Sequence, residues 1–200
     1  YLHPYDENHI IGIGKEAVDA SAEETFGRNL DFAWYQGVKL SLFDVSDVSN
    51  PREISKFNIG DRGTDSEALH EHKAFLFDKE KKLLVIPISL HEINREQYPN
   101  GVPPTAYGQL TFEGVYVLSL DKEDGFKLKG RISHVTDKEA DELVYYPRNY
   151  GEQIRRSLYI DNILYTVSQK LIKANNLGNL DEVNKVELSN TGRDYPVVMY

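Results

Sequence analysis

The sequence predicts an all-β fold made of repeated four-stranded units, and two recurring patterns lead to this prediction. The first is a hairpin with an Asp at the end of its first strand, at Tyr1–Gly14, Ala74–Ser89 and Ser157–Ser168. The second is a Gly-Val strand followed by a turn and another strand, at Gly37–Asp44 and again at Gly114–Asp121. Runs of β-branched and aromatic residues bounded by turn residues are typical of strands.

In chain order these patterns give three imperfect units, at residues 1–60, 73–134 and 155–189, with a tail at 190–200. Repeated four-stranded units are typical of a β-propeller, in which each small antiparallel sheet, or blade, stacks on its neighbours. Closed propellers have about four to eight blades. We therefore expect a single partial β-propeller domain of about three blades over residues 1–200, whose ring is completed by missing blades or by self-association. A β-sandwich is the alternative, but it does not require the elements to recur in one order.

The remaining strands are assigned from turn residues and β-propensity. The fourth strands of the first two units are Arg52–Ile59 and Phe126–Ser133. The third unit is shorter, with Lys170–Ala174 as its third strand and Glu182–Leu188 as its fourth.

Long insertions separate some of these strands. Lys15–Gln36, with a short helix expected at Ala17–Phe26, and the Pro-rich loop His91–Glu113 lie between second and third strands. The blade connections Gly60–His72 and His134–Ile154 are also long. Because strand direction alternates, all of these segments leave the sheets at the same end. Loops on a rigid scaffold commonly carry binding residues, so we expect the functional surface at this end.

Composition excludes several classes of function. The net charge is −9 without a Lys/Arg cluster, which argues against a nucleic-acid partner. The longest apolar runs, such as Leu83–Ile86, are far shorter than the ~20 residues that cross a bilayer, so membrane insertion is not expected. The absence of cysteine excludes disulfides, thiolate catalysis and Cys-ligated metals.

The sequence around the first blade connection resembles secreted archaeal and bacterial proteins with a C-terminal β-propeller domain. The residues that carry the resemblance are Leu42–Asp47 with Asn50-Pro51, Asp65-Ser66, Ala68-Leu69, and His72–Phe75 leading into Leu83–Ile88. The resemblance implies a propeller fold and a secreted or cell-surface location. It implies no enzymatic activity, and it transfers no catalytic residues.

The densest group of metal-ligating residue types is His70 and His72, with Asp65 as the carboxylate. In an extended strand the two histidines would point to the same side, so both could bind one divalent metal. The alternative interpretation is structural: His72 fixes the blade-to-blade connection, and His70 is solvated. The structural alternative is favoured, because two histidines and a carboxylate lack the spacing of a specific metal motif, and no cofactor is otherwise implied.

Aromatic and basic residues at the same end are candidates for ligand binding. Tyr146 and Arg148 precede the third unit, and Trp34 precedes the Gly-Val strand of the first. Tyr, Trp and Arg are favoured as interface anchors, although packing between blades is the alternative for each ring.

No P-loop, dinucleotide-binding or nucleophile-elbow motif is present. We therefore expect an extracellular binding or scaffold domain whose loop-rich face takes a protein or carbohydrate partner. One alternative is a propeller hydrolase or lyase with its site around His70 and His72. Another is a purely structural surface-assembly module.

Overall fold

The computed structural model describes residues 1–20, 32–135 and 151–188, and these form three four-stranded antiparallel sheets joined by turns and short 3-10 helices. The first sheet contains β1 (Leu2–Asp6), β2 (His9–Asp19), β3 (Ala33–Asp44) and β4 (Arg52–Ile59). The second contains β5 (Leu76–Asp78), β6 (Leu83–Glu92), β7 (Gln109–Asp121) and β8 (Gly125–Ile132). The third contains β9 (Arg156–Ile160), β10 (Ile163–Val167), β11 (Leu171–Asn176) and β12 (Glu182–Glu187).

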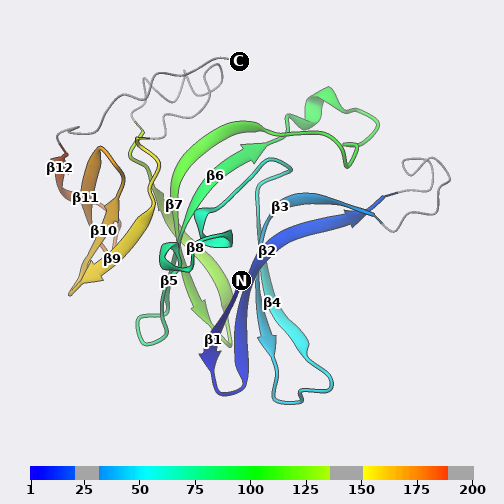
Figure 1. Ribbon diagram of the computed structural model, residues 1–200, viewed down its shortest axis with the longest axis horizontal. Coiled ribbons are helices and arrows are strands. Elements are labelled where there is room, and N and C mark those ends of the chain that lie inside the picture. The colour runs from blue at the N-terminus through cyan, green and yellow to red at the C-terminus, as the bar shows by residue number, and fades with distance from the viewer. Residues whose placement is uncertain (21–31, 136–150, 189–200) are drawn as a thin grey trace.

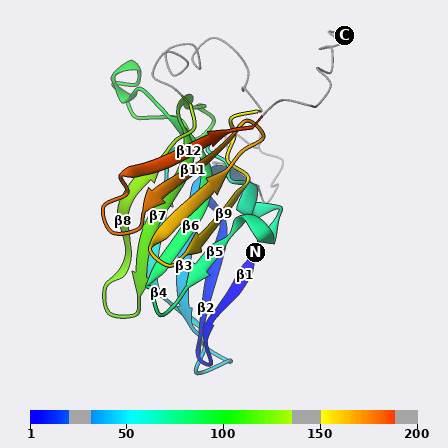
Figure 2. The ribbon, with the colours of Figure 1, turned by 90° about the vertical axis from the view of Figure 1, so that its left-hand side faces the viewer.

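Each sheet has its strands in sequence order, so neighbouring strands are joined by simple up-and-down connections. The sheets follow one another around the molecule as blades do, and the tight turns of the first two sheets lie in the lower part of Figure 1. The β4–β5 and β6–β7 segments leave from the opposite end, as the alternation of strand direction predicts. The turned view in Figure 2 shows the sheets stacked one behind another. The predicted all-β architecture of about three blades is therefore confirmed.

The core consists of two apolar layers, one on each side of the middle sheet. β6 is buried along most of its length, and its side chains alternate between the layers. Leu84 and Ile86 pack toward the first sheet, whereas Leu83 and Val85 pack toward the third. Successive residues of a strand point to opposite faces, so an uninterrupted apolar run is what a sheet covered on both faces requires.

Close backbone packing explains the repeated Gly-Val pattern in the first two sheets. A Cβ added to Gly37 in β3 would lie 2.2 Å from the carbonyl oxygen of Gly60, and one added to Gly114 in β7 would lie 2.3 Å from that of Ile132. Real Cβ atoms do not approach a carbonyl oxygen so closely. The third strands of the first two sheets therefore need glycine where they meet the end of the fourth strand.

Two expectations for the insertions are wrong, because the strands run further than predicted. Ala17–Asp19 belong to β2 rather than to a helix, with Val18 opposite Trp34 in the register, and residues 21–26 of the expected helix lie outside the described residues. β6 continues to Glu92 and β7 begins at Gln109, so the loop between them is shorter than predicted. Backbone pairing of Ala17–Asp19 with Ala33–Tyr35 across a long hairpin thus places these residues in a strand.

The connections contain the three 3-10 helices among the described residues, η1 (Glu67–Leu69), η2 (His72–Ala74) and η3 (Arg95–Gln97). None of the helices in the described part of the chain is long and apolar enough to cross a membrane.

The two outer faces of the stack differ in character. The register places Leu158, Ile160 and Val186 on the face of the third sheet that points away from the second, and all three are exposed. On the first sheet, Lys39 lies 3.0 Å from a Glu53 oxygen that also accepts a hydrogen bond from Ser41. The third sheet therefore has the apolar open face that packing against another blade would need, and completion of the ring stays a prediction.

Candidate functional site

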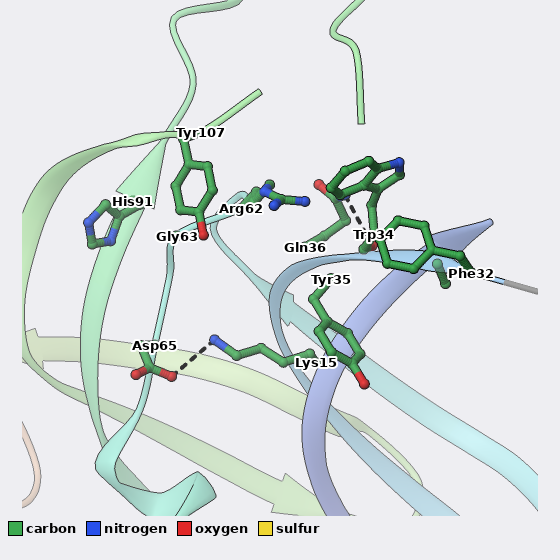
Figure 3. Close-up of a pocket in the computed structure, with 11 residues that line it drawn as sticks. Lys15, Phe32, Trp34, Tyr35, Gln36, Arg62, Gly63, Asp65, His91 and Tyr107 are labelled. Atoms are coloured by element: carbon green, nitrogen blue, oxygen red, sulfur yellow. Dashed lines mark hydrogen bonds and ion pairs between the residues drawn. The ribbon is translucent and has the colours of Figure 1, made fainter. Parts of the chain in front are cut away.

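The long segments meet at one end of the first two sheets and enclose a pocket of about 510 Å³ (Figure 3). Its walls come from three parts of the chain: Lys15 of β2 with residues 32–36 at the start of β3, Arg62, Gly63 and Asp65 after β4, and His91 near the end of β6 with Tyr107 from the β6–β7 segment. The volume lies within the range of about 300–1,000 Å³ typical of ligand pockets.

An arginine held between two aromatic rings forms one wall of this pocket. The guanidinium carbon of Arg62 lies 4.6 Å from the ring centroid of Trp34 and 4.7 Å from that of Tyr107. The rings of Phe32 and Trp34 meet edge to face, with centroids 4.7 Å apart. Both arginine contacts are within the roughly 6 Å over which a cation is attracted by an aromatic face.

Several rings of the pocket are open to solvent. The exposed fraction is 69% for Tyr35, 65% for Tyr107 and 49% for Phe32. Trp34 is half-buried, and its indole nitrogen has no hydrogen-bond partner among the described residues. Exposed rings gathered in a concave site are unusual for packing alone and typical of a binding surface.

The backbone around Arg62 is fixed from both sides. The carbonyl oxygen of Arg62 accepts a hydrogen bond from the amide of Gly108 at 2.8 Å, which ties the residue to the β6–β7 segment. Gly63 has a φ of +109°, and a Cβ there would lie 3.0 Å from the ring of His91. Glycine adopts this left-handed backbone region without the steric cost that a side chain would add. The turn after β4 therefore positions Arg62 beside the two rings.

A second wall of the pocket is polar. Lys15 Nζ lies 3.0 Å from the Asp65 carboxylate and also donates to the carbonyl oxygen of Thr64. Asp65 is in turn fixed by backbone hydrogen bonds of 3.0 and 2.9 Å to Ser89 of β6. The Gln36 side-chain amide donates to the carbonyl oxygens of Trp34 and Pro104, at 3.2 and 3.1 Å. Lys15 and Gln36 are thus tied to the backbone of other segments, and Lys15 in turn holds the Asp65 carboxylate.

Of the residues singled out in the sequence, the structure brings Trp34 and Asp65 together in the pocket. Tyr146 and Arg148 lie outside the described residues. His70 and His72 are exposed and do not line the pocket.

The metal hypothesis assumed that His70 and His72 lie on one extended strand, and this assumption is wrong. His70 follows η1 as its C-cap, and His72 begins η2, so the two imidazoles do not alternate on one strand face. Within the ranges that the structure describes, no three His, Asp or Glu side chains gather as a metal-binding group. Metal binding by His70 and His72 stays a prediction without a geometric basis.

The structural interpretation assigned the link between blades to His72, but His72 is exposed, and Glu67 and Glu71 make the ion pairs to the third sheet. Glu67 lies 3.4 Å from Arg155, and Glu71 lies 3.6 Å from Arg156 at the start of the third sheet. A hydrogen bond from the Lys73 amide lowers the pKa of the Glu71 carboxyl, and Arg156 lowers it further. The segment thus connects all three blades.

Sequence reasoning missed Arg62, Tyr107, Lys15 and Gln36. Tyr107 lies in the Pro-rich loop that was predicted at the functional end, so its position in the sequence could have marked it as a candidate binding residue. The pairing of Arg62 with Trp34 had no local signal, because it joins the segment after β4 to the start of β3.

Comparisons with known proteins agree with this architecture. A family model described as "Beta propeller domain" matches residues 1–180. An uncharacterised protein of Methanocaldococcus jannaschii is 26% identical over 190 residues, which cover 95% of this chain and 21% of that protein. An uncharacterised protein of Archaeoglobus fulgidus is 33% identical over 87 residues, which cover 44% of this chain and 11% of that protein. The chain thus spans about a fifth of the first relative's length.

No solved structure gives a significant match. The family match covers most of the chain and includes the strands β1 to β11 of the three sheets. Taken with the repeated blade pattern, it shows that this chain belongs to the β-propeller domain family.

Proposed function

We propose that this chain is a binding module of a secreted or cell-surface protein, and that it takes a carbohydrate in the pocket at its loop-rich end. The observation that carries the proposal is the combination of exposed rings and fixed polar groups in one concavity. Tyr35 and Phe32 offer apolar faces on which the C–H face of a sugar ring can stack. The Lys15–Asp65 pair beside them supplies a donor and an acceptor for hydroxyl groups.

A binding role is supported over hydrolysis by the carboxylates of the site. Asp65 is the one carboxylate among the described residues that line the pocket, and it is paired with Lys15. Glycoside hydrolysis commonly uses two carboxyl groups that flank the scissile bond at a defined separation. A carbohydrate is supported over a protein partner by the concave shape, since a stable protein interface buries about 800 Å² on each partner and is usually broader than one pocket.

Trp34 gives a direct test, because it is the single tryptophan of the chain and borders the pocket. We expect soluble neutral and acidic oligosaccharides, screened as a panel, to include some that change the Trp34 fluorescence in a saturable way. The Tyr35→Ala variant should bind these roughly two- to tenfold more weakly, because one stacking ring is lost.

The matched control is Tyr35→Phe, which keeps the ring and should retain most of the affinity. Calorimetric titration should give the same dissociation constants as fluorescence. If no oligosaccharide binds by either method, or if Tyr35→Ala binds as well as the unchanged chain, the proposed function is wrong.

A further inference from the structure

Arg62 is the one feature of the pocket that a neutral sugar would leave unexplained. Its guanidinium lies between the faces of Trp34 and Tyr107, 4.6 and 4.7 Å from their ring centroids, as Figure 3 shows. Rings on both faces hold the plane of the guanidinium while leaving the N–H groups at its edge available. The arrangement therefore orients a row of hydrogen-bond donors.

No carboxylate within the described ranges pairs with this cation. The neighbouring Asp61 is bound to Arg95 at 2.7 Å and also accepts a hydrogen bond from the Ile93 amide at 2.8 Å. Asp65, across the pocket, is paired with Lys15 at 3.0 Å. The Nε of Arg62 is buried and has no hydrogen-bond partner in the part of the chain that the structure describes.

A half-buried cation without a counter-ion is unfavourable, because burial removes hydration that the two ring faces replace only in part. A ligand anion at the edge of the guanidinium would remove this cost. Carboxylates match the planar edge best, since two parallel N–H···O hydrogen bonds can form at once. The protein as a whole carries a charge of −9, so an anion would be attracted here by local contacts rather than by the net field.

Resting on the carbohydrate-binding function proposed above, we propose that the ligand is an acidic carbohydrate and that Arg62 binds the carboxylate of a uronic acid residue. The rings of Tyr35 and Phe32, which also line the pocket, would stack on the sugar ring. Lys15, already paired with Asp65, contributes to binding hydroxyl groups rather than to binding the carboxylate.

The test compares ligands that differ in charge alone. Oligosaccharides of galacturonate, glucuronate-containing hyaluronan and alginate are titrated against the chain, each beside its carboxyl-reduced counterpart, which has the same linkages but no charge. At least one acidic form should bind about tenfold or more tightly than its reduced form, and this preference should weaken as salt is raised. Calorimetry is the primary readout, because changes at Arg62 also alter the surroundings of Trp34.

Variants then assign the preference to Arg62. Arg62→Gln should remove the preference for the acidic form, and Arg62→Lys should restore it only in part, because an ammonium group keeps the charge but not the planar fork. Arg52→Gln is the matched control: it removes the same charge from an exposed arginine that pairs with Asp44 at the opposite end of β3. Circular dichroism melts confirm that each variant is folded, and the comparison of ligands on the unchanged chain stands if Arg62→Gln fails to fold.

The outcomes are distinct. Equal binding of acidic and reduced forms would overturn the role of Arg62 and leave the carbohydrate site intact. An Arg52→Gln effect as large as that of Arg62→Gln would also overturn it, because net charge would then explain the preference. Binding by neither form in any pair would overturn both proposals.

Discussion

The junction between the second and third blades should weaken as the pH falls from about 6.5 to about 4, because of His134. This residue follows β8 and is buried against the third sheet, where its Nε2 lies 2.8 Å from the Thr166 hydroxyl of β10. Burial lowers the pKa of the imidazole from 6.5 to about 4, with a further contribution from the positive charge of Lys173 on β11, while Glu182 on β12 opposes the shift.

The direction of the change in the free energy of unfolding depends on whether the folded or the unfolded chain binds the proton more tightly. Below pH 6.5 the unfolded chain protonates His134, whereas the folded chain keeps it neutral until about pH 4. The free energy of unfolding therefore falls across this window and is unaffected above it. A shift from 6.5 to about 4, at ~1.36 kcal/mol per pKa unit, corresponds to a loss of roughly 3 kcal/mol.

Urea denaturation of the unchanged chain and of His134→Gln, measured every half unit between about pH 4 and 7.5, tests this directly. The glutamine side chain stays neutral, so the variant should lose the part of the slope between pH 4 and 6.5 that His134 contributes. Burial also lowers the pKa of His3, so this residue contributes to the same slope. The His3→Gln variant, measured in the same way, gives its contribution separately. Carboxylates titrate in both proteins, so the difference between them isolates the imidazole. Identical slopes for His134→Gln and the unchanged chain would refute the reasoning.

Three further predictions concern the packing of the blades and the pocket. Leu164→Ala, in the core between the second and third sheets, should lower the free energy of unfolding in urea by about 2–5 kcal/mol, whereas Leu158→Ala, on the open face, should change it by less than about 1 kcal/mol; equal effects would contradict the assigned faces. Tyr159→Phe should cost roughly 1 kcal/mol by removing the hydrogen bond to Asp78 that joins two blades, and an unchanged denaturation midpoint would count against that contact. Gly63→Ala should lower the melting temperature and weaken oligosaccharide binding together, since it strains the turn beside Arg62; unaltered binding would show that this turn does not position the site.

The repeat architecture was readable from the sequence because the first two blades need the same residues for the same reasons. Asp6 and Asp78 end the first strands of their blades and accept hydrogen bonds from backbone amides in the turns, at 3.0 and 2.8 Å. The Gly-Val strands need glycine where the fourth strand approaches. Such requirements are local, so they leave a pattern in the sequence.

The pocket was only partly readable, because its geometry depends on contacts between segments that are distant in the chain. Trp34 was a candidate from its position, but its pairing with Arg62 requires the fold. The histidines were misread because two side-chain caps impose short 3-10 helices: Ser66 accepts a hydrogen bond from the Ala68 amide, and Glu71 accepts one from the Lys73 amide. Ser and Glu immediately before such turns are a weak signal on their own.

The most direct test of the binding site is nuclear magnetic resonance of the ¹⁵N-labelled chain during titration with an acidic oligosaccharide. The chain has one tryptophan, so a single indole N–H signal reports on the pocket. We expect this signal and the amide signals of Gly63 and Tyr107 to shift together with saturation, while the amide of Val48, in the turn at the opposite end of β3, stays unchanged. Shifts confined to other parts of the molecule, with the Trp34 indole signal unmoved at saturation, would contradict the assignment of this pocket as the binding site.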